Sequence, residues 1–153
     1  MLWINSARLG RLEFTEKQVI AFPQGLPGFD TYTRYLLLPL EEKTTPVYFY
    51  LQSLEEGDLG FLLIDPFYFF TDYECHLPNE VVETLRIEKE EDVLILTTVT
   101  VPGTIERATT NLKAPLVFNM AQRLARQVLL EDTSYLIKQP LFIAESEGQG
   151  KEG

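Results

Sequence analysis

The chain has 153 residues, of which 45% are apolar and 24% charged, and its net charge is −10. This length fits one domain, and the composition is that of a folded protein rather than a disordered one. No apolar run approaches the roughly 20 residues of a membrane span, and the first residues, "MLWINSARLGR", lack the pattern of a signal peptide. We therefore expect a cytoplasmic protein that does not contact a membrane.

Short runs of β-branched and aromatic residues predict most of the secondary structure. They are "RLEF" (11–14), "RYLLLPL" (34–40), "PVYFYLQS" (46–53), "GFLLID" (60–65) and "DVLILTTVTV" (92–101). Such runs, separated by turn signals, are typical of half-buried strands. The turn "EEGD" at 55–58 predicts a hairpin between two of them. The expected fold class is mainly β: an antiparallel sheet forming a small barrel or sandwich, with one or two short peripheral helices.

Two segments carry helical signals, and the second is ambiguous. In "PNEVVETLR" (78–86), Asn79 is expected as N-cap, with Val81, Val82 and Leu85 on one face. Residues 119–132, "NMAQRLARQVLLED", have helical spacing and good helix formers. The same residues, read together with the preceding "LVFN", also fit a hairpin. Propensity favours the helix, and the pattern leaves both alternatives open.

The octapeptide "FPQGLPGF" (22–29) combines apolar side chains with four residues that restrict or free the backbone. Its prolines fix φ and remove donors, while its glycines permit positive φ. We expect a rigid loop whose Phe22, Leu26 and Phe29 fold inward and cap the core. A stiff loop is also a good recognition edge, because little entropy is lost when a partner binds.

The negative charge is concentrated between residues 44 and 85. This segment contains no Lys or Arg and eight acids: Glu55, Glu56, Asp58, Asp65, Asp72, Glu74, Glu80 and Glu83. Such a surface repels phosphate, which argues against direct binding of nucleic acid or of anionic membranes, and it attracts basic partners. The alternative is that the acids only keep the protein soluble.

Five of the eighteen aromatic residues lie in "IDPFYFFTDYE" (64–74), beside several of these acids. Asp65 and Pro66 predict a turn that splays the rings. The rings fill the core or form an apolar groove with an acidic rim, which would suit an amphipathic helix with basic flanks. The candidate partner-binding residues are Asp65, Phe67, Tyr68, Phe70, Asp72, Tyr73 and Glu74, with Glu55, Glu56 and Asp58.

Catalytic and metal-binding signals are weak. The single cysteine, Cys75, excludes an internal disulfide, and the single histidine, His76, is its neighbour. We expect a small buried thiol and a surface imidazole, with no metal and no cofactor, because no zinc, phosphate-loop or nucleophile motif occurs. Asp72 and Glu74 could share one face of a strand, so the alternative function is a carboxylate-dependent hydrolase or isomerase that uses the acidic aromatic cleft.

Five motifs occur in an order that resembles the flagellar assembly factor FliW family. They are "FPQGLPGF" (22–29), "LQS" (51–53), "DPFYFFTDYE" (65–74), "NLKAPLVFN" (111–119) and "QVLLED" (127–132). The resemblance runs from about Gly10 to Leu141. It implies a single FliW-like β domain over residues 1–144, followed by a flexible tail at 145–153, and it favours a hairpin for 116–130.

The resemblance also implies a function. Members of the family are non-enzymatic proteins of the bacterial cytoplasm that bind newly made flagellin. When flagellin has been exported, they bind CsrA, an RNA-binding regulator, and relieve its repression of flagellin translation. We therefore expect flagellin and CsrA as partners, no direct nucleic-acid binding, and a monomer in the unbound state. The acidic segment fits a basic partner such as CsrA.

Overall fold

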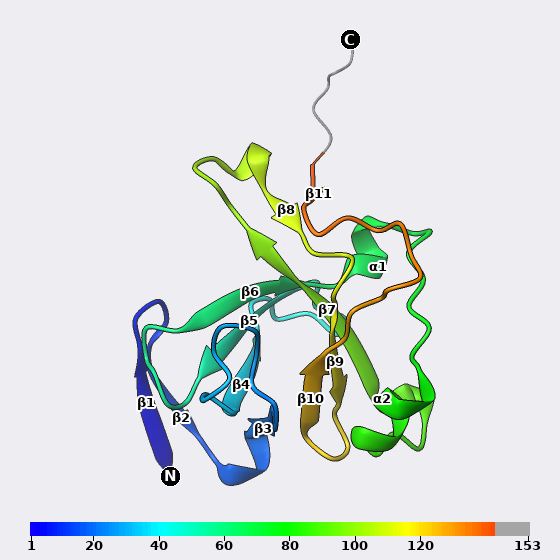
Figure 1. The fold of residues 1–153 in the computed structure, drawn as a ribbon. Coiled ribbons are helices and arrows are strands. Elements are labelled where there is room, and N and C mark those ends of the chain that lie inside the picture. The colour runs from blue at the N-terminus through cyan, green and yellow to red at the C-terminus, as the bar shows by residue number, and fades with distance from the viewer. Residues whose placement is uncertain (143–153) are drawn as a thin grey trace.

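A computed structural model of the chain describes residues 1–142 (Figure 1). The expected tail at 145–153 lies outside the described residues. The strands are β1 (Leu2–Ser6), β2 (Gly10–Phe14), β3 (Ile20–Ala21), β4 (Arg34–Pro39), β5 (Tyr48–Ser53), β6 (Gly60–Ile64), β7 (Val93–Thr100), β8 (Thr109–Thr110), β9 (Leu116–Asn119), β10 (Leu124–Gln127) and β11 (Gln139–Pro140). The helices are η1 (Glu16–Gln18), α1 (Pro66–Phe69), α2 (Asn79–Thr84), η2 (Glu90–Asp92) and η3 (Ile105–Arg107).

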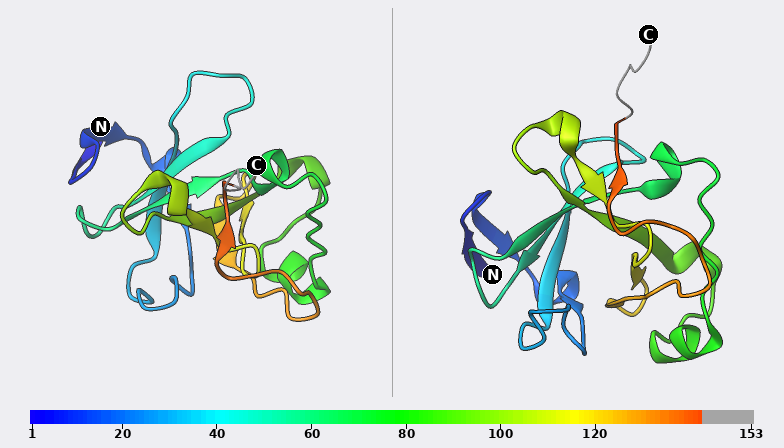
Figure 2. Two further views of the ribbon diagram at one scale, coloured as in Figure 1. Left: turned by 90° about the horizontal axis from the view of Figure 1, so that it is seen from above. Right: turned by 45° about the horizontal axis from the view of Figure 1, so that its top comes forward.

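The main sheet closes into a barrel. Its strands follow the order β7-β6-β5-β4-β3-β10-β9, and β9 pairs again with β7. All pairs are antiparallel except β3 with β10, which meet in parallel at Ala21 and Leu124. Strands β8 and β11 extend the far end of β7 outside the closed part, as the turned views of Figure 2 show. The mainly β, barrel-like fold expected from the sequence is therefore confirmed.

The barrel interior is filled by apolar side chains that alternate along the strands. Phe22, Tyr35 and Phe118 are fully buried, and the ring of Phe22 meets the other two edge-on, with centroids 5.0 and 5.8 Å apart. The strands add Ile20, Leu51, Leu63, Leu96, Leu116 and Ala125 to this core. Because successive residues of a strand point to opposite faces, the other face of β7, β9 and β10 is free to carry a second apolar layer.

A two-stranded hairpin, β1–β2, lies beside the barrel and contacts it at the β5–β6 turn. Strand β2 was expected from the run at 11–14, whereas β1, whose residues Leu2 and Trp3 are exposed, was not. The Ala7 N–H donates to the Gly57 carbonyl (2.9 Å). That turn is stabilised from inside by Gln52, whose Nε2 donates to the carbonyls of Gly57 and Leu59 (both 3.2 Å). The expected hairpin at 55–58 is confirmed.

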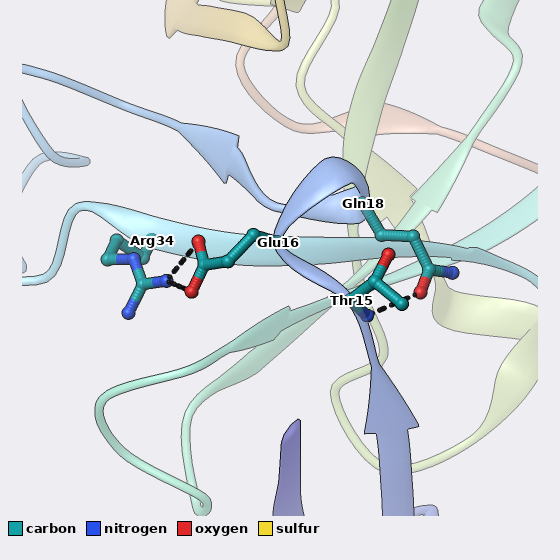
Figure 3. Close-up of polar contacts among 4 residues, drawn as sticks. All are labelled: Thr15, Glu16, Gln18 and Arg34. Atoms are coloured by element: carbon teal, nitrogen blue, oxygen red, sulfur yellow. Dashed lines mark hydrogen bonds and ion pairs between the residues drawn. The ribbon is translucent and has the colours of Figure 1, made fainter. Parts of the chain in front are cut away.

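The connection from the hairpin into the barrel runs through η1 (Figure 3). The Thr15 N–H donates to Gln18 Oε1 (2.9 Å), which satisfies one of the free donors at the start of this short helix. Arg34 Nη2, on β4, donates to both carboxylate oxygens of Glu16 (3.0 and 2.9 Å). These contacts fix the entry of β3 next to β4.

The octapeptide closes one end of the barrel, and we call residues 22–30 the cap loop. Phe22 and Leu26 are buried in the barrel core, as expected. Phe29 was expected to point inward, but it is 37% exposed and packs edge-on against Phe61, so this expectation is wrong. Gly25 (φ +66°) requires glycine, because a Cβ there would lie 2.4 Å from the Asp30 Cα.

Residues 116–130 form the β9–β10 hairpin, so the family resemblance was right and helix propensity was wrong. Leu116 and Phe118 face the barrel interior, whereas Val117 faces the second layer. Asn119 fixes the end of the hairpin, because its Nδ2 donates to the carbonyls of Leu85 (2.7 Å) and Arg86 (3.0 Å). Burial on both faces favours a strand over a one-faced helix.

The second layer packs α2 and residues 70–77 against the outer face of β7, β9 and β10. Its centre is formed by Tyr73, Val81, Leu85, Leu112, Val117, Val128 and Leu130. The expected helix is confirmed, but its N-cap is Pro78, not Asn79, and no side chain caps it. Within residues 1–142, no helix is long and apolar enough to cross a membrane.

Candidate functional site

A short helix creates the most exposed aromatic region of the chain. Strand β6 ends at Ile64, and Asp65 caps α1 because its Oδ1 accepts the Phe67 N–H (2.9 Å). Pro66 occupies the first helical position, where its missing N–H costs nothing. The turn expected at Asp65–Pro66 is present as this four-residue helix, and it directs successive rings to different sides.

The rings around α1 form two groups, one of Tyr68, Phe69 and Phe142 and one of Phe67 with Tyr73 and Tyr135. Phe67 is 40% and Tyr68 67% exposed, and Tyr68 meets Phe69 edge-on at 5.3 Å. Phe142, which is 39% exposed, reaches the same Phe69 ring from the C-terminal segment, with centroids 6.4 Å apart. We call the exposed faces of Phe67, Tyr68 and Phe142, with Phe69 between the last two, the α1 surface. An exposed apolar group of this kind is typical of a site that binds another protein.

Aromatic residues on the inner side of the α1 surface support it. Tyr73 is 4% exposed, and its hydroxyl donates to the Leu112 carbonyl (2.8 Å). Burial raises the pKa of the Tyr73 hydroxyl. Its ring lies 5.3 Å from Phe67 and 4.8 Å from Tyr135. Tyr73 therefore holds the surface in place, and it is not itself available to a partner. Phe70 packs against both the second layer and the cluster around Ile64.

A groove with a volume of about 570 Å³ lies beside this region, between α2 and the segment that follows β10. Its apolar part consists of Val81, Val128, Leu129 and Leu130, and its charged part of Glu74, Glu80, Glu131 and Asp132 with Arg126 and His76. We call it the acidic groove. Four carboxylates face a single arginine and one imidazole, so the groove favours a basic segment of a partner.

Only part of this charge is neutralised within the chain. Arg126 Nη1 donates to Glu80 Oε2 (2.6 Å) and to Thr84 Oγ1 (3.1 Å), which ties β10 to α2. His76 Nε2 lies 3.2 Å from Glu74 Oε1, and both side chains are largely exposed. An exposed pair of this kind contributes little to stability. Glu131 and Asp132 are exposed as well.

The acids that the sequence analysis grouped into one segment are divided by the fold. Asp65, Asp72 and Glu74 lie around α1, whereas Glu55 and Asp58 lie in the β5–β6 turn, at the other end of β6 (Figure 1). A five-residue strand spans roughly 17 Å. Glu56 belongs to the same turn, where its Oε2 accepts the Asp58 N–H (3.2 Å). The ten candidate residues therefore do not form one surface.

The Glu55 carboxylate has a structural role in this turn. Its Oε1 accepts the backbone N–H groups of Thr33 (2.7 Å) and Arg34 (3.3 Å). The turn is further fixed by the Ser53 hydroxyl, which accepts the N–H of both Glu55 and Glu56 (3.1 and 3.0 Å). Glu55 and Asp72 are both exposed, but the Glu55 carboxylate already satisfies two backbone donors and is therefore less available to a partner.

The contributions of the C-terminal segment were not expected from the sequence. Phe142 belongs to the α1 surface, Tyr135 supports it, and Glu131 and Asp132 line the acidic groove. These residues lie more than 55 positions after α1 in the sequence, and only the chain path across the second layer brings them there. The acids of "QVLLED" and the apolar run "YLI" at 135–137 were visible signals, but nothing in the sequence indicates what they lie against.

Two groups with reactive side chains, Cys75 and Glu41, have shifted pKa values. Burial raises the pKa of the Cys75 thiol to about 11, which disfavours the nucleophilic thiolate. The pKa of Glu41 is lowered because its carboxylate accepts the Val47 N–H, so this group does not resemble a general acid. Within residues 1–142, no three His, Cys, Asp or Glu side chains are grouped closely enough to hold a metal ion.

Comparisons with known proteins agree on one family. The family model described as "FliW protein" matches residues 3–141. A flagellar assembly factor FliW from Clostridium botulinum (strain Langeland) is 36% identical over 94% of this chain and 99% of its own length. The corresponding protein of Natranaerobius thermophilus is 42% identical over 91% of each chain. A crystal structure of the flagellar assembly factor FliW superposes with a TM-score of 0.87 at 38% identity, covering 94% and 99% of the two chains.

Proposed function

The chain belongs to the FliW family of flagellar assembly factors, and on that premise we propose that it binds newly made flagellin in the cytoplasm and binds CsrA once flagellin has been exported. CsrA bound in this way no longer represses flagellin translation. The protein then couples translation to the amount of flagellin left inside the cell. It acts by association alone, without catalysis or a cofactor.

The α1 surface supports flagellin as the first partner. The terminal segments of flagellin form amphipathic helices, and the exposed rings of Phe67, Tyr68 and Phe142 offer a matching apolar face. These rings pack on Phe69 and Tyr73, which are held by the core. Because the anchors are already ordered, little side-chain entropy is lost on binding. Aromatic anchors of this kind carry most of the energy of protein interfaces.

The acidic groove supports CsrA as the second partner. An RNA-binding protein presents basic surface, and Glu74, Glu131 and Asp132 offer carboxylates that are exposed in the free chain. Charge complementarity of this type mainly accelerates association and fixes orientation. The negative charge of the groove also repels RNA, so the protein can bind CsrA without binding the RNA that CsrA recognises.

The two surfaces are connected through a short chain of contacts. The Glu74 N–H donates to the Tyr135 hydroxyl (2.9 Å), Tyr135 lies against Tyr73, and Tyr73 lies against Phe67. A partner on either surface can thus affect the other, by direct overlap or by displacing these rings. This arrangement fits a protein whose two partners alternate.

The first test removes the aromatic anchors. The double substitution Phe67→Ala with Tyr68→Ala should weaken flagellin binding at least about tenfold in calorimetric titration. Trp3→Ala is the matched control: Trp3 is 52% exposed and stacks on Arg11 in the β1–β2 hairpin, away from α1. Unchanged affinity of the double variant would contradict the proposal.

The second test reverses charge. Replacing Asp72 and Glu74 with lysine should slow association with purified CsrA, and the affinity of the unmodified chain should fall as salt rises. Replacing Glu13 and Glu106 with lysine changes the net charge equally at sites distant in sequence, and it should have a smaller effect. The electrostatic part is wrong if CsrA binding is absent at low salt or independent of salt. Loss of flagellin binding with CsrA binding intact would mean that the two surfaces are reversed.

A further inference from the structure

The chain stays extended beyond the end of β10 at Gln127, and there it has a neighbouring strand on only one of its two edges. The Val128 N–H donates to the Pro115 carbonyl (2.9 Å) and the Leu130 N–H to the Lys113 carbonyl (2.8 Å). These bonds continue the register of the β9–β10 pair, in which Gln127 lies opposite Leu116. Because ladder bonds alternate along an antiparallel pair, Gln127 and Leu129 direct their backbone groups to the other edge.

The other edge is paired only at its beginning. Strand β3 meets β10 at Ala21 and Leu124, and the Ala21 N–H donates to the Arg123 carbonyl (2.9 Å). The chain then turns at Pro23 into the cap loop and leaves the sheet. Within residues 1–142, β3 pairs with β10 only at Leu124, so no strand lies along the outer edge of Gln127, and Leu129 takes part in no backbone hydrogen bond of the loops and turns. We call residues 127–129 the open edge.

A groove lies where β3 leaves the sheet. It has a volume of about 520 Å³, and its lining includes Leu26, Pro27, Asp30, Ala114, Gln127 and Leu129. The cap loop on one side is held by the buried Leu26 and by the tight turn at Gly25. Leu129 is 54% exposed, although both of its neighbours, Val128 and Leu130, are buried. The groove is therefore a preformed slot beside unpaired strand groups.

Negative charge lies in and next to this slot. Asp30 lines it, and Glu131 and Asp132 follow the open edge in the chain and line the adjoining acidic groove, which shares Leu129 with the slot; all three acids are exposed. Lys113 is the nearby cation, and its ammonium group is engaged by the carbonyl oxygens of Glu131 and Thr133. A partner segment with basic residues fits these charges better than an acidic one.

From these observations we infer that the open edge binds an extended, basic and apolar segment of a partner protein, which adds to the sheet as a strand. Its backbone pairs with Gln127 and Leu129, an apolar side chain enters the groove against Leu26 and Leu129, and a basic flank faces Glu131 and Asp132. Strand addition of this kind takes affinity from main-chain hydrogen bonds and specificity from alternate side chains. This site is separate from the α1 surface but shares Leu129, Glu131 and Asp132 with the acidic groove, and strand addition at its open edge is tested without either proposed partner.

Amide hydrogen exchange measured by NMR tests the inference, with a synthetic heptapeptide of sequence KTVTVTK, acetylated and amidated, as the probe. When the free peptide concentration is about ten times the dissociation constant, the peptide should slow hydrogen exchange of the Gln127 and Leu129 amides about tenfold. The Val128 and Leu130 amides, already bonded to Pro115 and Lys113, should change little. This alternation distinguishes strand addition from general stabilisation.

Two controls sharpen the experiment. The peptide ETVTVTE should bind more weakly, because its flanks repel Glu131 and Asp132. Leu129→Pro removes one edge donor and should reduce peptide binding, whereas Leu129→Ser keeps the N–H and tests the side chain alone. Proline is tolerated at a strand edge whose N–H faces solvent. If Leu129→Pro fails to fold, the pattern of amide protection in the unmodified chain still tests the inference: exchange at Gln127 and Leu129 should slow, and exchange at Val128 and Leu130 should not.

Three results would overturn the inference. The Gln127 and Leu129 amides could already be protected in the free chain, which would mean that the chain fills its own edge. Their protection could rise with protein concentration in the absence of peptide, which would identify a second copy as the occupant. Or the peptide could leave both amides unchanged and shift only signals of the α1 surface.

Discussion

Two regions of this chain are rich in aromatic residues, and the fold treats them in opposite ways. In the barrel, Phe22, Tyr35 and Phe118 are fully buried and meet edge-on. At α1, Phe67 and Tyr68 keep 40% and 67% of their surface exposed, although they touch other rings as well. The two regions differ because the barrel is closed around its rings and α1 is not. Strands surround the first group on all sides, whereas a four-residue helix leaves the second with one uncovered side.

The comparison separates stability from binding. A ring enclosed by the barrel contributes its whole apolar area to folding, about 25 cal/mol per Å². A ring on the α1 surface leaves part of that area for a partner. Substitutions in the barrel should therefore change stability, and substitutions at α1 should change binding.

The largest expected effect contrasts Phe118→Ala with Phe67→Ala. Phe118→Ala leaves a cavity in the closed core and should lower the free energy of unfolding by about 3–5 kcal/mol. Phe67→Ala should lower it by about 1 kcal/mol or less, since the ring is 40% exposed. Urea denaturation followed by circular dichroism measures both. Equal losses would show that the α1 rings belong to the core, and the comparison would fail.

A second contrast lies in the cap loop, which closes the barrel. Both Gly25 (φ +66°) and Gly28 (φ +84°) adopt positive φ, but only at Gly25 would a Cβ meet backbone, 2.4 Å from the Asp30 Cα. Gly28→Ala should cost about 1–2 kcal/mol from backbone strain alone. Gly25→Ala should cost more, because the Asp30 backbone must also move. Thermal denaturation compares the two variants. A smaller loss of stability for Gly25→Ala than for Gly28→Ala would show that the Asp30 backbone does not obstruct a Cβ at residue 25.

A third contrast concerns two buried tyrosine hydroxyls. Tyr73→Phe removes the donor to the Leu112 carbonyl, leaves that oxygen unsatisfied, and should cost about 1–3 kcal/mol. The Tyr35 hydroxyl is buried without a hydrogen-bond partner among residues 1–142, and burial raises its pKa to about 12. Tyr35→Phe should therefore leave stability unchanged or improve it in the same assay. If Tyr35→Phe lost more stability than Tyr73→Phe, the Tyr35 hydroxyl, and not the Tyr73 hydroxyl, would be the one that stabilises the fold.

The smallest effect is a dependence of stability on alkaline pH. Burial raises the pKa of Cys75 from 9.0 to about 11, so in this interval the folded chain keeps a proton that the unfolded chain has lost. Its contribution is complete below pH 9 and is lost as pH rises through 11, amounting to about 1 kcal/mol at pH 10. Cys75→Ala should flatten the decline of Tm between pH 8 and 11. Parallel curves for both proteins would show that the thiol titrates alike in both states.

The sequence predicted local features more reliably than their assembly. The runs at 34–40, 46–53 and 92–101 became strands because β-branched and aromatic side chains suit a pleated surface buried on at least one face. Residues 119–132 were ambiguous, because helical spacing and strand alternation both fit them. Strand β1 was missed because Leu2 and Trp3 remain exposed, so no clear alternation marks it.

The candidate site was predictable only in part. The turn at Asp65–Pro66 and its cluster of rings follow from proline geometry and composition, and these were anticipated. That Tyr73 is buried while Tyr68 is exposed depends on which neighbours cover each ring. Tyr135, which packs on Tyr73, and Phe142, which packs on Phe69, come from 62 and 73 positions further along, respectively. Spacing within the segment carries no information about such contacts.

What the sequence determined by itself was the class of structure and the kinds of surface: a β-rich domain with an acidic, aromatic segment suited to protein partners. Only the tertiary structure decided how these are distributed. The extended β6 holds Glu55, Glu56 and Asp58 at one of its ends and the α1 residues at the other. The packing of the second layer brought Glu131 and Asp132 to Glu74, and the departure of β3 left residues 127–129 with a neighbouring strand on one side only. Propensity and periodicity act between residues close in the chain, whereas strand pairing and burial join residues that are far apart in it.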